Sequence, residues 1–277
     1  MKRGMTMTRA QNSWLLGYLR TLAEGLPFRE ARTVAPLWLA AERRVAPGQA
    51  DACGPARLTI QMAAEVYQRL VVAGPAGAGK TTSLRQLASG LAEAILAAEE
   101  RGGSRGQAQR GTEALPLPLY VELAHFSNDL RAALEMSFGP GAPPLDDLAR
   151  GGQLLFLLDG LDELAPDAQL MSLSALARAF AGLGGQARWI ITCRTENLPL
   201  FRPWLGTAEV RLVQPMRCRD ALAIVQRQCG DELAEWLGRA DDLASLATRP
   251  RWLSGLLALA EAGAIAAPFS RGGVLAA

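Results

Sequence analysis

One segment of eight residues, 74–81, limits the fold of this chain more than any other. It reads Gly-Pro-Ala-Gly-Ala-Gly-Lys-Thr and lies between a short apolar run at 70–73 and leucines with helical spacing at 79–98. Glycines at these positions let the backbone turn tightly and point successive N–H groups at one anion. The start of the following helix adds a partial positive charge. Because the segment matches G-x-x-x-x-G-K-[ST] in full between a predicted strand and helix, it predicts a phosphate-binding loop.

The same motif predicts which residues contact a nucleoside triphosphate. We expect Lys80 to reach the β and γ phosphates and Thr81 to place its hydroxyl on Mg²⁺, with Thr82 in the first turn of the helix. The lysine is conspicuous, since Lys2 and Lys80 are the only lysines among 29 basic residues. The predicted nucleotide-binding residues of the loop are Gly74, Pro75, Ala76, Gly77, Ala78, Gly79, Lys80, Thr81 and Thr82.

A second polar cluster follows a buried strand expected at 153–158. That run shows no alternation of polar and apolar residues, which is typical of a strand covered on both faces. Asp159 would then lie at the carboxyl end of a parallel strand, where ligands bind, and would hold Mg²⁺, usually through water. Gly160 leaves room for the metal's ligands, and either Asp162 or Glu163 is expected to polarise the attacking water.

A third strand, expected at 187–193, also ends in a polar residue. Arg194 directly follows it, and an arginine at this edge of the sheet senses or stabilises a γ phosphate. The alternative interpretation of Arg194 is an ordinary surface arginine at the end of a strand.

The order of these elements predicts an α/β fold. Short apolar strands alternate with helices up to residue 214, so we expect a three-layer P-loop NTPase fold with a mainly parallel sheet. Only helical patterns follow, which predicts a small all-α lid. We therefore divide the chain into an N-terminal extension at 1–57, an NTPase domain at 58–207 and a helical lid at 208–277. The expected strands are 70–73, 119–123, 153–158, 187–193 and 210–213, and the expected helices include 14–22, 58–68, 79–98, 170–183, 221–228, 231–237, 241–248 and 252–262.

Read together, the motifs resemble the NACHT branch of the STAND NTPases. The Asp-Gly-Leu-Asp-Glu string at 159–163, which follows five apolar residues and a phosphate-binding loop, is typical of that family. Residues 117–123 resemble its second strand, which a proline often introduces. Thr192, Cys193 and Arg194 resemble its Thr-Ser-Arg sensor strand, although Thr195 stands where the family usually has proline. Residues 249–253 are similar to its lid turn, in which Pro250 would lie near the nucleotide base.

The resemblance covers residues 58–265 and carries further implications. It implies ATP or ADP with Mg²⁺ as ligands, sometimes GTP, and a switch that oligomerises when nucleotide is bound. Members usually carry an effector domain before the NTPase and a repeat sensor after it. The 277 residues hold neither, so we expect a truncated form that self-associates or works with a separate protein partner.

Composition narrows the range of partners and the location. The net charge is only +2 and the arginines are scattered, so nucleic acid is not an expected partner. No run of eighteen uncharged apolar residues occurs, so no membrane span is expected. The four cysteines form no C-x-x-C pair and the N-terminus lacks a secretory pattern, which together favour a cytoplasmic protein.

The leading hypothesis is a NACHT-type ATPase whose slow hydrolysis drives a conformational or oligomerisation switch in signalling or defence. One alternative is a scaffold that holds ADP as a structural part and hydrolyses nothing. Another is an AAA+-like loader or chaperone, in which Arg202 or Arg211 would act in trans on a neighbouring subunit's nucleotide.

Overall fold

A computed structural model describes residues 9–24, 37–41, 57–101, 109–110, 113–126, 132, 143–150, 154–164, 169–182, 187–239 and 241–265. Its main sheet has seven strands in the order β2-β1-β9-β3-β8-β7-β6. In chain order these strands are β1 (Trp38–Ala41), β2 (Leu58–Thr59), β3 (Arg69–Gly74), β6 (Leu117–Glu122), β7 (Leu154–Asp159), β8 (Ala187–Arg194) and β9 (Glu209–Val213). A separate two-stranded ribbon pairs β4 (Gln109–Arg110) with β5 (Glu113–Ala114).

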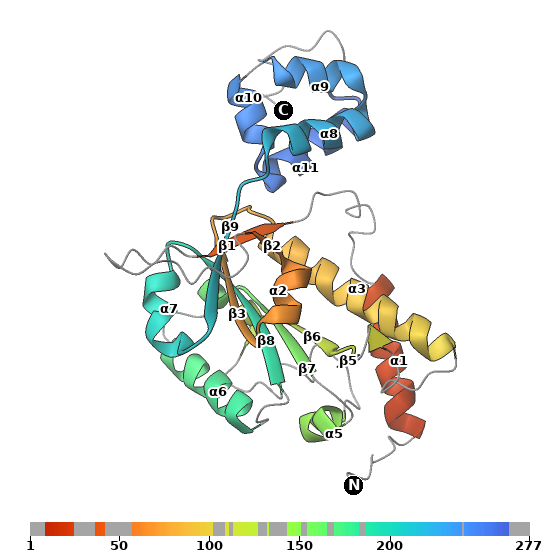
Figure 1. Cartoon of the computed structure of the whole chain (residues 1–277), viewed down its shortest axis with the longest axis vertical. Helices are drawn as coiled ribbons and strands as arrows, with labels where there is room; N and C mark the ends of the chain where they lie inside the picture. Colours follow the sequence, from red (N-terminus) through yellow and green to blue (C-terminus); the bar gives the residue numbers. More distant parts are fainter. Residues whose placement is uncertain are drawn as a thin grey trace.

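Helices occupy both sides of this sheet, which makes three layers. Figure 1 shows α1 and α3 on one side and α6 and α7 on the other, as the alternating pattern predicts. The helices are α1 (Arg9–Glu24), α2 (Ile60–Val66), α3 (Lys80–Glu100), α5 (Leu145–Arg150), α6 (Gln169–Gly182), α7 (Leu198–Leu205), α8 (Cys218–Cys229), α9 (Asp231–Gly238), α10 (Asp241–Ala247) and α11 (Pro250–Glu261), with short 3₁₀ turns η3 (Leu123–His125) and η4 (Leu161–Glu163).

The centre of the sheet is parallel, as predicted. Pairing is parallel from β9 through β3, β8 and β7 to β6, whereas β1 runs antiparallel to both β9 and β2. All six residues of β7 are buried, and so are all residues of β3 except the first. Burial on both faces explains why these strands lack alternation: helices cover each side of a parallel sheet.

Most expected elements differ from the structure by a few residues at their ends, and the helix expected at 14–22 spans Arg9–Glu24. Two of the differences have a clear physical reason. The helix expected at 58–68 begins only at Ile60, because Leu58 and Thr59 pair with β1 and Thr59 caps the helix by accepting a hydrogen bond from the Met62 N–H at 3.2 Å. The strand expected at 119–123 begins at Leu117 and so contains Pro118. That proline is tolerated because, among the described strands, β6 is the last of the sheet and pairs with β7 alone.

The N-terminal segment that we separated as an extension shares the core of the sheet. Leu19 of α1 and Leu39 of β1 are both fully buried in that core, and α1 packs against α3. At the other boundary, β9 lies inside the sheet although our division places it in the lid. The division into domains stays a proposal, and these contacts move its boundaries: the sheet unit would include α1 and β1 and extend through Val213.

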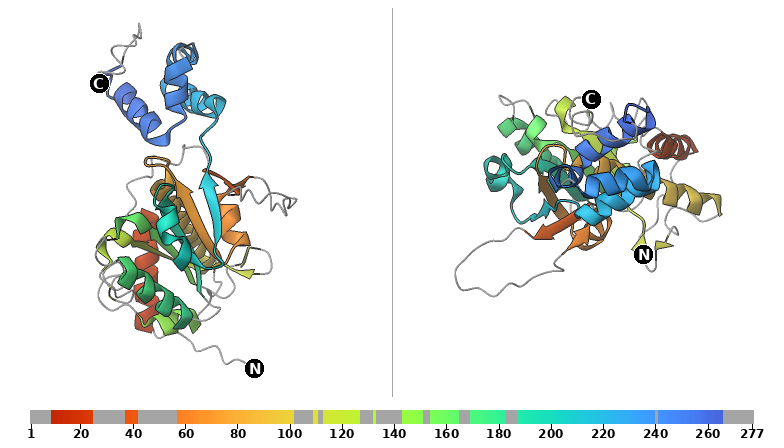
Figure 2. Two further views of the ribbon diagram at one scale, coloured as in Figure 1. Left: turned by 90° about the vertical axis from the view of Figure 1, so that its left-hand side faces the viewer. Right: turned by 90° about the horizontal axis from the view of Figure 1, so that it is seen from above.

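The C-terminal helices, α8 to α11, have a hydrophobic cluster of their own. Residues 214–217 lead from β9 to these helices, which stand beyond the carboxyl ends of the parallel strands (Figure 2). Each helix contributes apolar side chains to that cluster, whose buried members are Ala221, Ile224, Val225, Leu233, Leu237, Leu243, Ala247, Leu253, Leu256 and Leu257. Among the described helices, none has the length and apolar character that crossing a bilayer requires.

A substitution in α1 tests whether this helix belongs to the core. Leu19→Ala should lower the free energy of unfolding by about 2–5 kcal/mol, because it removes a fully buried side chain and leaves a cavity. Chemical denaturation measures the change. Arg20→Ala, at an exposed neighbouring position, should change it by less than about 0.5 kcal/mol. Equal stability of the two variants would show that α1 is not part of the folded core.

Candidate functional site

The loop between β3 and α3 is shaped by two glycines with positive φ. Gly77 has φ 72° and Gly79, the N-cap residue of α3, has φ 85°. L-amino acids with a side chain seldom adopt this region, so the motif's glycines supply the turn that leads directly into the helix. The loop is closed by a hydrogen bond from the Ala78 N–H to the Pro75 carbonyl at 3.3 Å.

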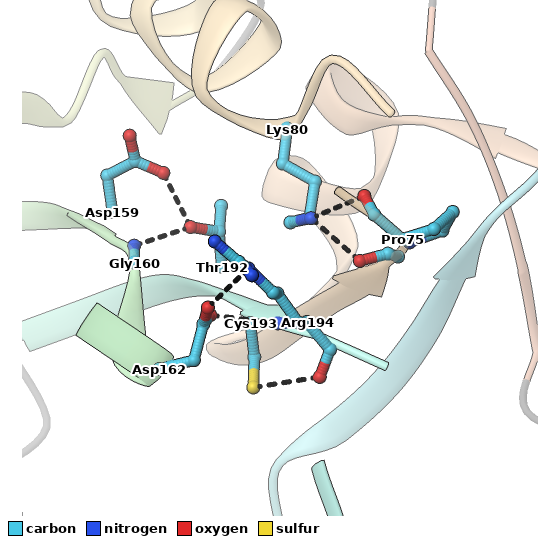
Figure 3. Close-up of polar contacts among 9 residues, drawn as sticks. Pro75, Lys80, Asp159, Gly160, Asp162, Thr192, Cys193 and Arg194 are labelled. Carbon is cyan, nitrogen blue, oxygen red and sulfur yellow. Dashed lines mark hydrogen bonds and ion pairs between the residues drawn. The ribbon is translucent and has the colours of Figure 1, made fainter. Parts of the chain in front are cut away.

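Lys80 folds back over the loop that precedes it. Its ammonium group donates to the carbonyl of Gly74 at 2.7 Å and to that of Pro75 at 2.9 Å (Figure 3). Burial lowers the pKa of Lys80, and the negative charge of Asp162 partly opposes that effect. A bound anion would stabilise the charged ammonium, since burial alone disfavours it.

Asp159 ends β7 and its carboxylate is held at both oxygens. The Thr192 hydroxyl donates to Oδ1 at 2.5 Å, and the Tyr120 hydroxyl donates to Oδ2 at 3.0 Å. Thr192 also accepts a hydrogen bond from the Gly160 N–H at 2.8 Å, as Figure 3 shows. Asp159 is 8% exposed, so its orientation is set by these hydroxyls more than by solvent.

Asp162 and Arg194 form a pair across the ends of β7 and β8. Asp162 accepts from the Arg194 backbone N–H at 2.9 Å, and its other oxygen lies 2.9 Å from Nε of the same arginine. The Asp162 side chain is 5% exposed and that of Arg194 is 46% exposed. The Asp162 carboxylate is therefore buried in its ion pair with Arg194, whereas part of the guanidinium group stays accessible to solvent.

Glu163 differs from its neighbouring acids because it is exposed. Partial withdrawal of its carboxyl group from water still raises its pKa, and the charges of Asp159 and Asp162 raise it further. The sharp turn that brings it back toward the strand depends on Gly160, which has φ 79°. A Cβ at Gly160 would lie 2.8 Å from the Glu163 carboxyl group and would push that flexible side chain aside, but the positive φ is what favours glycine here.

The C-terminal helices touch the phosphate-binding loop at the start of α11. The Arg251 N–H donates to the Gly77 carbonyl at 3.3 Å, and a Cβ at Gly79 would lie 3.4 Å from the Pro250 ring. Pro250 is the first residue of α11, where its lack of an N–H costs nothing. The predicted lid proline thus lies against the loop.

A cavity of about 410 Å³ lies among these elements. Its lining brings together nearly every residue that the sequence singled out, from both the loop and the strand ends. Those lining residues are Ala76, Gly77, Ala78, Gly79, Lys80, Thr81, Thr82, Asp159, Asp162, Glu163, Arg194 and Pro250. Gly74 and Pro75 are not among the described residues that line it; they contribute the carbonyls that bind Lys80.

Sequence reasoning did not assign a role to several residues that the structure adds. Leu37, Gln86 and Ser254 line the cavity through tertiary packing, whereas Arg251 lines it from within the lid turn at 249–253, where sequence reasoning assigned a role to Pro250 alone. Thr192 also lines it: the sequence placed it in the string with Arg194 but indicated no role of its own, although its position two residues before Arg194 puts it on the same face.

The suggestion that Arg211 acts on a neighbouring subunit is wrong. Its side chain is 2% exposed within β9, where it bonds the Tyr67 hydroxyl and lies 3.0 Å from Glu209. A side chain buried in the sheet does not reach another molecule.

The cavity's oxygen groups fit a divalent metal. The Thr81 hydroxyl and the Asp159 carboxylate both line it, and hard oxygen ligands of this kind suit Mg²⁺. Lys80 and loop residues 76–79 also line the cavity, and the start of α3 with the lysine suits an anion. The arrangement can therefore hold a polyphosphate together with its metal.

Comparison with known proteins places this geometry in a family. A scan of protein families matches residues 68–232 to the NACHT domain. A search of curated proteins finds no match. Among solved structures, Cdc6p from Pyrobaculum aerophilum is 17% identical with a TM-score of 0.41 over 70% of this chain, which spans 56% of that protein's length. Domain III of the replication initiation protein DnaA from Thermotoga maritima is 14% identical with a TM-score of 0.40, over 94% of this chain and 88% of that one.

A pair of glycine substitutions tests the geometry at Gly160. Gly160→Ala should lower the free energy of unfolding by about 1–2 kcal/mol, because alanine is strained at φ 79° and its methyl group meets Glu163. Gly90→Ala is the matched control: it lies inside α3 with open space around it, so it should stabilise the protein by about 0.5–1 kcal/mol. Denaturant midpoints report both changes, and the same sign for both would contradict the turn described here.

Proposed function

This chain belongs to the NACHT domain family, and from that premise we propose that it binds ATP or ADP with Mg²⁺ and hydrolyses ATP slowly. In the proposal, the nucleotide state changes the position of the C-terminal helices and the self-association of the chain, as part of signalling or defence. The observation that carries it is one cavity that is lined by loop residues, by Lys80 and Thr81, and by Asp159. The family match to residues 68–232 supports nucleotide binding.

The chain's residues would divide the work of binding as follows. Backbone N–H groups of residues 77–81 and the Lys80 ammonium bind the phosphates, while Thr81 and Asp159 hold the metal. When bound, Mg²⁺ would neutralise negative charge on the phosphates. Pro250 lies against the loop beside Leu37, where these apolar groups would contact the nucleotide base.

Glu163 is the better candidate for orienting the attacking water. Asp162 is ion-paired with Arg194 and its side chain is 5% exposed, so its charge is already engaged by the arginine and little of it is accessible to a water molecule. Glu163 is exposed on the cavity lining, and its raised pKa makes it a stronger base than an ordinary glutamate. Arg194, which is 46% exposed, would turn from Asp162 toward a γ phosphate and so sense which nucleotide is present.

The contact between α11 and the loop suggests how nucleotide would act at a distance. The Arg251 N–H donates to the Gly77 carbonyl. If phosphate binding moves the backbone of the loop, this hydrogen bond would therefore shift the first turn of α11. The C-terminal helices share one hydrophobic cluster and would move together. Self-association or binding of a separate protein partner would then follow the state of the loop.

Removing the loop lysine tests nucleotide binding and the switch together. Lys80→Ala should weaken ATP affinity about a hundredfold, because hydrogen bonds from an ammonium to phosphate are worth about 3 kcal/mol. Calorimetry with ATP, GTP and ADP in the presence of Mg²⁺ measures the affinity. Light scattering after size exclusion should show a larger mass for the wild type with a non-hydrolysable ATP analogue, and no change for the variant.

Arg101→Ala, an exposed site at the other end of α3, is the control and should behave as the wild type. If well-folded wild type gives no binding heat with adenine or guanine nucleotides, nucleotide binding is rejected. If ADP copurifies, the mass never changes and no phosphate is released, the protein is an ADP-locked scaffold.

A second substitution tests the role of Glu163. Glu163→Gln should leave nucleotide affinity intact and slow phosphate release by about 10²–10⁴-fold, which is the usual contribution of a general base. The wild-type rate should fall as the pH drops through the pKa of Glu163, above the usual glutamate range, because protonation removes the base. The variant should lose that part of the pH profile.

Glu196→Gln is the matched control, since Glu196 is exposed and lies outside the set of described residues that line the cavity. It should leave both the rate and the pH profile unchanged. Unchanged hydrolysis in Glu163→Gln would reject Glu163 and assign the water to Asp162.

A further inference from the structure

A chain of polar contacts reaches Asp159 from outside the cavity. The Tyr120 hydroxyl lies 3.0 Å from Asp159 Oδ2, and Arg85 Nε lies 3.0 Å from the same hydroxyl. Arg85 also pairs with Glu122, and its guanidinium lies 5.5 Å from the centre of the Tyr120 ring. None of these three is among the described residues that line the cavity, so we expect no direct contact between them and a bound nucleotide.

The direction of each hydrogen bond follows from the groups involved. An arginine Nε only donates, and an ionised carboxylate only accepts. The Tyr120 oxygen therefore accepts from Arg85 and gives its single proton to Asp159. The more distant Glu122 oxygen, at 3.5 Å from the hydroxyl, is occupied by Arg85 instead.

The hydroxyls of Tyr120 and Thr192 together fix both oxygens of Asp159. Thr192 accepts from the Gly160 N–H, so its own proton is available for Asp159 Oδ1 at 2.5 Å. Each carboxylate oxygen can accept more than one hydrogen bond, so each keeps lone pairs for other ligands. The carboxylate is thus held in one orientation while it can still bind a metal or its waters.

The backbone explains why these residues meet. In the parallel pairing of β6 with β7, Glu122 is the partner of Asp159 and Tyr120 lies two residues earlier on the same face. Arg85 is four residues after Thr81 on α3, hence on the same side of that helix. One helix therefore carries a candidate metal ligand, Thr81, and the arginine that supports the other ligand.

We propose that Tyr120 is a positioning residue that orients the Asp159 carboxylate for Mg²⁺ on bound nucleotide, with Arg85 and Glu122 holding the tyrosine in place. The proposal rests on the proposed function, because it concerns the metal of that same site. Partners that orient a metal-binding side chain commonly change metal affinity by about 10–100-fold when they are removed.

Tyr120→Phe tests this, because it deletes one hydroxyl and keeps the ring. Equilibrium titration with a fluorescent ADP analogue in EDTA gives the metal-free affinity, which should stay within about twofold of wild type because Tyr120 does not line the cavity. Repeating the titration at increasing Mg²⁺ concentrations shows how much the metal raises the nucleotide affinity. The readout is the Mg²⁺ concentration at which half of that increase is reached. That concentration should rise about tenfold in the variant.

Tyr18→Phe is the matched control. The Tyr18 hydroxyl donates to the Pro118 carbonyl at 2.9 Å and accepts from the Tyr120 backbone N–H at 3.4 Å. The control therefore removes a buried tyrosine hydroxyl that contacts the backbone of the same strand, β6, but it leaves the Tyr120 hydroxyl and its bond to Asp159 in place. It should leave the Mg²⁺ dependence unchanged. Equal shifts in the two variants would mean that β6 is merely loosened, and this result would overturn the proposal.

A second variant keeps the test decisive if Tyr120→Phe does not fold. Arg85→Gln leaves Tyr120 in place but removes its ion-paired support, and it should shift the Mg²⁺ dependence in the same direction by a smaller factor. An unchanged Mg²⁺ dependence in folded Tyr120→Phe or in Arg85→Gln overturns the positioning role alone. A wild type that binds no nucleotide, with or without metal, overturns the proposed function as well.

Discussion

The site depends on the parallel alignment of three neighbouring strands, β3, β8 and β7. Gly74 pairs with Arg194 and Leu158 pairs with Ile191, so all three strands end at the same edge of the sheet. Because the strands run in the same direction, the phosphate-binding loop, the arginine and the acidic turn emerge together. If β8 or β7 ran the other way, its polar end would lie at the opposite edge, a strand's length away from the loop.

At this edge of the sheet, Lys80 and Asp159 carry opposite charges, and a single ligand could stabilise both. Burial lowers the pKa of Lys80, which disfavours its charged form, while burial and neighbouring acids raise the pKa of Glu163. Arg194 balances Asp162, whereas the described residues that hydrogen-bond the Asp159 carboxylate do so through neutral hydroxyls. A polyphosphate with its metal would supply a negative partner for the lysine and a positive partner for the aspartate.

The C-terminal helices take part in this site without contributing to the sheet. Their cluster is separate from the main core, yet Pro250 and Arg251 at the start of α11 lie on the glycines of the loop. A Cβ at Gly77 would lie 3.1 Å from the Cβ of Arg251, which is a tight approach, whereas one at Gly79 would make ordinary contact with Pro250 at 3.4 Å; at both positions the positive φ favours glycine. The glycines thus serve the turn and the packing of the helices against it.

The sequence alone determined the loop at 74–81, the parallel α/β fold and the family, because these follow from local patterns: glycine positions, unbroken apolar strands and polar residues directly after them. It located Asp159, Asp162, Glu163 and Arg194 but left the two acids after Gly160 equivalent. Only the tertiary structure separated them, since pairing with Arg194 depends on a contact between strands 32 residues apart in the chain. It likewise decided that α1 and β1 join the core and that Tyr120 supports Asp159, because such contacts depend on sheet register and packing, which no local spacing records.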